Sequence, residues 1–197
     1  MSPSAIEKAK RRLNLAITHV SELPKSKGYS EYCDHWYQFL VAFNNVLTML
    51  KKGAKDNPSS RQWFGQKEAE RRKDQLVQYL FQARDDDEHG IGSVLTFTPP
   101  RAFFTGRNSG ASSISFTVND GNMKGKLKIK STDGENVVVR VMPSVTSLSK
   151  VVGRGPVEYA PPKIHNGKIL QDTSPLAIAS LGIIYLEQLI VEAEGMV

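Results

Sequence analysis

The sequence predicts an α+β protein in which an antiparallel helical bundle is interrupted, before its last helix, by a small antiparallel β-rich section. Apolar residues recur at three-to-four spacing through residues 1–90, which is typical of amphipathic helices. From 91 to 171 the pattern changes to short β-branched runs separated by Gly, Asn, Asp and Pro. A helical pattern returns in 172–197. We therefore expect a bundle over 1–90, a basic β-rich section over 91–171, and a C-terminal helix that packs back on the bundle.

Three helices are expected in the bundle, over residues 4–23, 30–52 and 60–84. Pro24 ends the first and Gly53 ends the second. Short loops join them, so each helix should lie antiparallel to the one before. The third contains a strongly charged run, Lys67 to Asp74, which we interpret as a solvated face with salt-linked neighbours rather than a nucleic-acid patch.

Four strands are expected in the β-rich section, over residues 93–98, 113–118, 124–130 and 136–142. Turn residues at 119–122 and 132–134 indicate hairpins, and 104–112 and 153–167 read as loops. Residues 91–171 hold 11 Lys and Arg against 4 Asp and Glu, in a chain whose net charge is +6. The positive charge is therefore concentrated in this section, which favours an anionic partner.

A row of four lysines alternates with other residues in this section: Lys124, Lys126, Lys128 and Lys130. A strand repeats every two residues, so all four should share one face. The row is typical of a solvated sheet face or a protected edge strand. The alternative is a row that binds the phosphates of RNA or another polyanion.

The last helix should begin at Pro175, because Ser174 is a good N-cap and proline suits the first helical position. It is apolar nearly all round as far as Val191, so we expect it to lie between layers or to form a homodimer interface. Its uncharged stretch from Pro175 to Leu186 is too short to span a bilayer, so no membrane is expected. With one cysteine, Cys33, and no leader pattern, the expected location is the cytoplasm.

Three of the four histidines should converge. In an antiparallel bundle, the end of the first helix, the start of the second and the end of the third lie together. His19, His35 and His89 would then share one end of the bundle, with Arg84 beside them. Such a group, if it forms, is a candidate functional site.

The segment Arg84-Asp85-Asp86-Asp87-Glu88-His89 resembles the signature of the HEPN family (higher eukaryote and prokaryote nucleotide-binding). That resemblance implies a four-helix bundle, dimers and, in many members, metal-independent cleavage of RNA. It would make His89 the general acid or base at a ribose 2′-hydroxyl, Arg84 the residue that stabilises the phosphate charge, and Asp85 the residue that orients the site. His19 and His35 would support it. The residue types suit this chemistry.

Two other interpretations of the same residues stay open. Arg84 could pair with its acidic neighbours while His89 interacts with the C-terminal end of its helix. Alternatively, carboxylate and histidine pairs such as Glu31 with His35 could hold a metal ion. The sequence contains no phosphate-binding glycine loop, zinc-spaced cysteines or dinucleotide fingerprint, so no cofactor is expected. The alternative to an RNA-associating protein is a non-catalytic interaction module that dimerises through the last helix.

Overall fold

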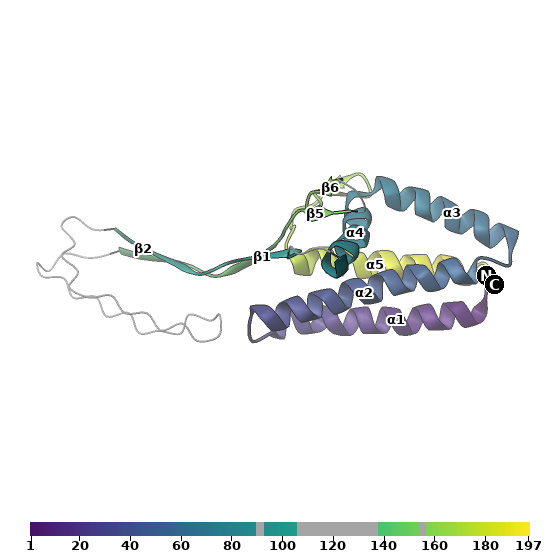
Figure 1. Ribbon diagram of the computed structural model, residues 1–197, viewed down its shortest axis with the longest axis horizontal. Helices are drawn as coiled ribbons and strands as arrows, with labels where there is room; N and C mark the ends of the chain where they lie inside the picture. Colours follow the sequence, from purple (N-terminus) through teal and green to yellow (C-terminus); the bar gives the residue numbers. More distant parts are fainter. Residues whose placement is uncertain (90–92, 106–137, 154–156) are drawn as a thin grey trace, which may run out of the picture.

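The computed structural model describes residues 1–89, 93–105, 138–153 and 157–197, with the backbone alone for 88–89, 102–105 and 138–139. Within them lie five α-helices, one short 3-10 helix and eight short strands. The helices form a bundle, and a narrow two-stranded ribbon leaves it at one end (Figure 1). This arrangement confirms the expected fold class, a helical bundle with a small antiparallel β-rich section before the last helix.

The first two helices form an antiparallel pair. α1 (Pro3–Glu22) and α2 (Tyr29–Gly53) are joined by a 3-10 turn over Leu23–Lys25. α1 buries residues at helical spacing from Ile6 to Ala16, and α2 buries a stripe from Trp36 to Leu50. Both helices were expected within two residues of their observed ends, because their apolar periodicity and their stop signals agree.

The expected single helix over 60–84 is wrong, because the chain forms two helices there. α3 (Pro58–Lys73) ends at Asp74, whose backbone is extended, and α4 (Gln75–His89) begins directly after it. The Asp74 carboxylate accepts the Val77 backbone N–H at 3.0 Å. An aspartate that bonds the backbone in this way starts a new helix rather than continuing the old one. α3 and α4 consequently run in different directions (Figure 1).

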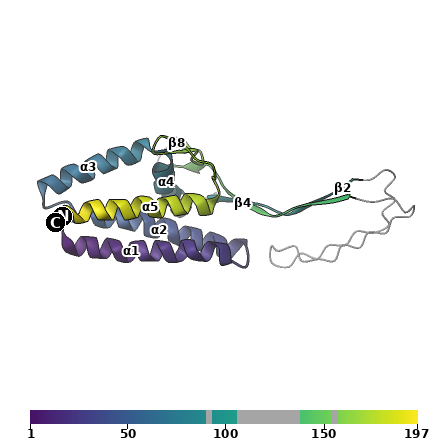
Figure 2. The same cartoon turned by 180° about the vertical axis from the view of Figure 1, so that it is seen from behind.

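The last helix, α5 (Pro175–Glu194), begins as expected, and Ser174 Oγ accepts the Ala177 N–H at 3.3 Å. It lies beside α1 and antiparallel to it (Figure 2). The Met1 ammonium donates to the Met196 carbonyl at 2.7 Å, which brings the two chain ends together. α5 also contacts α2, α4 and β4, so more than one side of it is covered. Its exposed side is a stripe that includes Leu176, Ile184 and Val191.

α5 is the one helix in the described ranges whose length and composition would allow it to cross a membrane, a test that core helices also pass. The whole helix has 20 residues and is therefore longer than its uncharged stretch from Pro175 to Leu186. Ile178, Leu186 and Ile190 are buried against the bundle. We therefore interpret α5 as a core helix.

Four strands form one long ribbon. β1 (Leu95–Thr98) pairs with β4 (Val145–Leu148), and β2 (Arg101–Thr105) pairs with β3 (Val138–Met142), both antiparallel. The two pairs share one register, from Leu95 opposite Leu148 to Thr105 opposite Val138. Pro99 and Pro100 separate β1 from β2. We call residues 95–105 and 138–148 the ribbon arm. At about 3.3 Å per residue the arm is roughly 35 Å long.

Two small hairpins follow the arm and contact α4. β5 (Val151–Val152) pairs with β6 (Glu158–Tyr159), and β7 (Ile164–His165) pairs with β8 (Lys168–Ile169). Asn166 and Gly167 join β7 to β8 with φ of 49° and 74°, the positive values that a tight hairpin turn needs. The loop expected over 153–167 is therefore wrong in part, because β6 and β7 lie within it and are paired. The loop expected over 104–112 is also wrong in part, because β2 extends to Thr105. The expected strands at 113–118 and 124–130, with their turns, lie outside the described residues.

Candidate functional site

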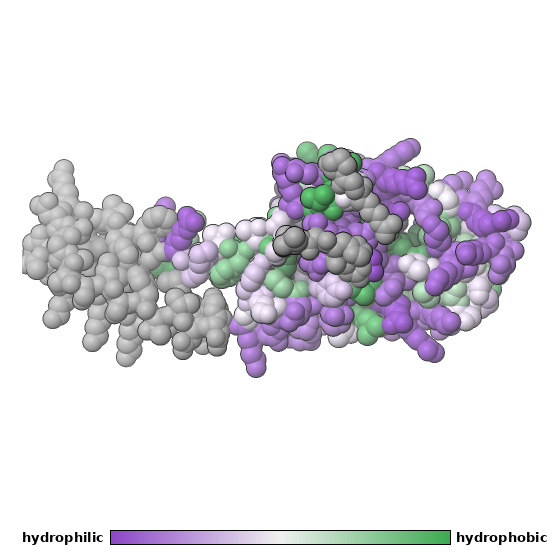
Figure 3. Space-filling view, in the orientation of Figure 1, coloured by the Kyte–Doolittle hydropathy of each residue, from purple (hydrophilic) through white to green (hydrophobic). Residues whose placement is uncertain are grey.

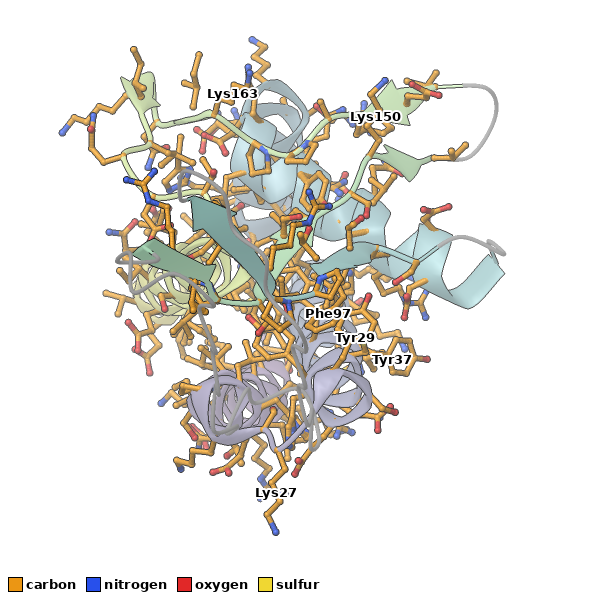
Figure 4. The ribbon with its side chains drawn as sticks, turned by 90° about the vertical axis from the view of Figure 1, so that its left-hand side faces the viewer. Lys27, Tyr29, Tyr37, Phe97, Lys150 and Lys163 are labelled. Carbon is orange, nitrogen blue, oxygen red and sulfur yellow. The ribbon has the colours of Figure 1, made fainter. Side chains whose placement is uncertain are left out.

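The ribbon arm is anchored at its base by one tyrosine. Tyr29, at the start of α2, donates its hydroxyl to the Leu95 carbonyl at 2.7 Å, and its ring lies 5.2 Å from that of Phe97 between centroids. Viewed along the arm, Tyr29 and Phe97 lie side by side where the ribbon meets the helices (Figure 4). These contacts fix the first strand of the arm to the bundle.

The described part of the arm carries only positive charge. Arg101 pairs with Met142 across the ribbon, and Arg140 lies two residues before Met142, so both arginines share one face. Both are exposed, and neither forms an ion pair with any residue that the structure describes. The arm sequence contains no Asp or Glu. This face can therefore offer two guanidinium groups to an anion.

Three further lysines are labelled in the view along the arm. Lys27 lies at one edge of the molecule, and Lys150 and Lys163 lie at the opposite edge (Figure 4). Lys150 pairs with Glu158 at 3.2 Å, whereas Lys27 and Lys163 form no ion pair within the described ranges. The predicted anion-binding row, Lys124 to Lys130, lies outside the described residues and stays a prediction.

Two of the three histidines meet as expected. Nδ1 of His19 on α1 lies 3.2 Å from Nδ1 of His35 on α2, so one ring must donate its hydrogen to the other. Burial, and then the neighbouring His35, lower the pKa of His19 below its ordinary value. The antiparallel α1–α2 pair thus brings these two side chains together, as the sequence predicted.

The third histidine ends α4, and only its backbone is described. Asp87, two residues earlier, lies near enough to Cys33 on α2 to help raise the pKa of that thiol, although burial is the larger cause. The C-terminal end of α4 therefore lies beside the start of α2. This placement agrees with the expected convergence of His89 with the other two histidines at the level of the backbone.

Arg84 and Asp85 interact with each other. Arg84 Nη1 donates to Asp85 Oδ1 at 3.1 Å, and the two side chains are 30% and 12% exposed. A guanidinium that already binds a carboxylate in a half-buried position has less of its charge available for a phosphate. The geometry of this pair fits the interpretation in which Arg84 bonds its acidic neighbours.

The carboxylate and histidine pairs do not assemble into a metal site where side chains are described: no three His, Cys, Asp or Glu groups come together there. Glu31, considered as a ligand with His35, instead accepts the Lys27 backbone N–H at 2.7 Å. It therefore acts as a local cap on the turn before α2.

The sequence did not predict one polar cluster, around Asp74. Asp74, at the α3–α4 junction, accepts hydrogen bonds from His165 Nδ1 at 3.0 Å and from the Asn166 backbone N–H at 2.8 Å. Burial opposes ionisation here, but the hydrogen bonds outweigh it and lower the pKa of Asp74. The adjacent Asn166-Gly167 turn signal in the sequence could have revealed the hairpin, though not its contact with Asp74. The cluster fastens β7–β8 to α4.

No protein-family model matches this chain, and the searches of curated proteins and of solved structures found no match either. The HEPN resemblance therefore depends on Arg84, Asp85 and His89 alone and stays a hypothesis.

Proposed function

We propose that this chain is a polyanion-binding protein that uses the ribbon arm to contact RNA or a similar phosphate chain. The observation that carries the proposal is the pair of exposed arginines, Arg101 and Arg140, on one face of a projecting ribbon without acidic residues. Arginine suits this role because its planar fork donates two hydrogen bonds to phosphate oxygens.

The surroundings of the arm support the same function. Lys27 and Lys163, which form no ion pair within the described ranges, add two further cations on opposite sides of the view along the arm (Figure 4). A projecting two-stranded ribbon is narrow enough to lie along or between nucleic-acid strands, as β-ribbons do in other DNA-binding proteins. Contacts of this kind recognise phosphates rather than sequence, so binding should weaken steeply with salt.

The test is fluorescence anisotropy with labelled single-stranded RNA, from about 50 to about 200 mM salt. Arg101→Glu with Arg140→Glu should lower the affinity about tenfold or more and flatten the log–log salt slope by about 1.4, at ~0.7 per lost phosphate contact. The matched control is Arg11→Glu with Arg12→Glu, which makes the same charge change at exposed positions of α1. Equal losses in both double variants, or none in either, would show that the arm is not the binding surface.

The lysine row belongs to the same proposal. Lys126→Glu with Lys128→Glu should also weaken RNA binding and flatten its salt dependence, since the substitutions reverse two charges in the segment between β2 and β3. An unchanged affinity would leave the row as an ordinary solvated face.

For RNA cleavage, we expect the bound RNA to stay intact. Arg84 is engaged by Asp85, and three further acids follow Asp85 before His89, which disfavours a phosphate at this point. RNA incubated with the protein in EDTA should show no products on a gel. Cleavage that disappears in His89→Ala would overturn this expectation and restore the catalytic hypothesis.

A second candidate function, self-association through α5, is favoured by one observation. Leu176, Ile184 and Val191 lie on one stripe of α5 and remain 37%, 47% and 65% exposed. Burying them against a second copy would remove apolar surface from water. Light scattering should then give a dimer that Ile184→Lys dissociates. A monomer at all concentrations would exclude this function.

A further inference from the structure

A cavity of about 180 Å³ lies between four helices, α2, α3, α4 and α5. Its apolar walls come from one residue each of α2, α3, α4 and α5: Leu47, Phe64, Phe81 and Leu189. Half of its polar lining, Lys67, Glu68 and Arg71, comes from α3, which leans away from α2 and α5 (Figures 1 and 2). The cavity is therefore apolar on several sides and charged on one.

The charged side occupies helical positions that normally carry apolar residues. Phe64, Lys67, Glu68 and Arg71 follow the i, i+3, i+4, i+7 spacing of an inward-facing stripe, and all four line the cavity. Lys67, Glu68 and Arg71 belong to the charged run that the sequence led us to interpret as a solvated face. These three side chains instead turn toward the space between the helices. Polar groups at inward positions call for a partner.

Three of the four charged groups that line the cavity have partners. Lys51 binds Glu68 at 2.8 Å, and Lys67 binds Glu192 at 2.9 Å and Glu70 at 3.1 Å. Arg71 has none: its guanidinium carbon lies 3.6 Å above the Phe81 ring, and no carboxylate or hydrogen-bond acceptor reaches it among the described residues. Burial lowers the pKa of Arg71, yet an arginine keeps its charge at neutral pH. Arg71 is thus the one charged group lining the cavity that forms no ion pair among the described residues, although the nearby carboxylates of Glu68 and Asp85 act to raise its pKa.

Tyr185 on α5 adds a hydrogen-bond donor. Burial raises its pKa to about 12, so the hydroxyl is neutral and protonated at pH 7. This hydroxyl has no hydrogen-bond partner in the described part of the chain, and the residue lines the same cavity as Arg71. A ligand that accepts hydrogen bonds from both groups would satisfy them.

We propose that this cavity binds a small aromatic monocarboxylate, with its carboxylate at Arg71 and Tyr185 and its ring among Phe64, Phe81 and Leu189. A volume of about 180 Å³ is sufficient for a benzene ring, because an apolar cavity of about 150 Å³ accepts one. A ligand with one carboxylate fits the charge of the cavity, because Arg71 is the lining cation that forms no ion pair in the described part of the chain, and the Glu68 carboxylate in the same lining disfavours a second negative charge. The site is separate from the ribbon arm and does not depend on the arm's proposed function.

The test uses the full chain and benzoate, with isothermal titration calorimetry as the readout. Benzoate should bind, and benzamide, acetate and inorganic phosphate should bind at least about tenfold more weakly. Benzamide lacks the negative charge, and acetate and phosphate lack the aromatic ring. Arg71→Met should weaken benzoate binding by about tenfold to a hundredfold. The matched control is Arg72→Met, which removes the exposed arginine next to it and should leave the affinity unchanged.

A second variant protects the test against misfolding of Arg71→Met. Thr48 lines the cavity from an exposed position of α2, so Thr48→Trp should fill the cavity without disturbing the core and should abolish benzoate binding. The proposal is overturned if benzoate does not bind, if benzamide binds equally well, or if benzoate binds Thr48→Trp as tightly as it binds the unmodified chain.

Discussion

Large apolar side chains are buried in the bundle of this chain but exposed to solvent in its ribbon arm. In the bundle, large side chains such as Trp36, Phe39 and Leu186 are almost completely buried. In the arm, Val141, Met142 and Val145 are more than half exposed. Figure 3 shows pale and green atoms along the arm near the bundle and purple atoms toward its outer end, whereas most of the bundle surface is purple. The arm therefore gains little stability from burial. A two-stranded ribbon is marginal by itself, so its stability depends on the contacts at its base.

The largest expected difference is between core and arm truncations. Phe39→Ala should lower the free energy of unfolding by about 3–5 kcal/mol, because it leaves a cavity among buried residues. Met142→Ala in the arm should change it by less than about 0.5 kcal/mol, as surface substitutions do. Urea denaturation of both variants measures this. A Met142→Ala loss comparable to that of Phe39→Ala would mean that the arm packs against something in solution.

The next largest effect is expected where α5 packs closely against the bundle. A Cβ added at Gly182 would lie 2.7 Å from Leu80 Cδ1 and 3.3 Å from Phe39 Cζ. Gly182→Ala should therefore destabilise the protein by about 1–3 kcal/mol through overpacking, although alanine favours helices. Gly65→Ala in α3, where no atom lies within 4 Å of the added Cβ, is the control and should be neutral or stabilising. Thermal unfolding of the two variants separates these outcomes.

A smaller effect tests the link between the two regions. Tyr29→Phe removes the hydrogen bond to the Leu95 carbonyl and keeps the ring beside Phe97. It should cost about 0.5–1.5 kcal/mol. Hydrogen exchange should quicken in β1 and β4 but not in α1 or α2. Uniform acceleration throughout the bundle would contradict the assignment of Tyr29 to the anchoring of the arm.

The smallest expected effect is a dependence of the protein's stability on pH, which comes from groups in the bundle and at its contact with the β7–β8 hairpin. The pKa of His19 is lower in the folded protein than its ordinary 6.5, so the folded state takes up a proton less readily than the unfolded chain. Stability should therefore fall as the pH drops through about 6.5. The lowered pKa of Asp74 acts in a separate window, below its ordinary 3.8, where stability is lost as that carboxylate is protonated.

His35→Gln tests the histidine pair. It removes the second ring while leaving a group that can bond His19, so the drop in melting temperature between pH 7.5 and pH 5.5 should become smaller than in the unmodified chain. His165→Gln, away from α1 and α2, is the comparison variant. An unchanged drop in His35→Gln would show that the pair does not contribute.

The sequence predicted most of the bundle because the relevant signals are local. Pro175 after Ser174 starts α5, and the stripe from Trp36 to Leu50 identifies α2. The same reasoning failed at Asp74, because a helical pattern continues on both sides of the residue that divides it. It also failed at Arg101–Thr105, because two prolines suggested the end of a strand, whereas pairing with Val138–Met142 continues the ribbon beyond them.

The sequence by itself determined the positions of α1, α2 and α5, the charge of the β-rich section and the meeting of His19 with His35. Each follows from composition, from periodicity or from a short antiparallel connection. Only the tertiary structure decided that Leu95 pairs with Leu148, that Asp74 meets His165, and that Arg71 faces a cavity. The physical reason is that these contacts join residues far apart in the chain or depend on how a helix is rotated. A helix charged on every side, as α3 is after Phe64, gives no indication in its sequence of which face will turn inward.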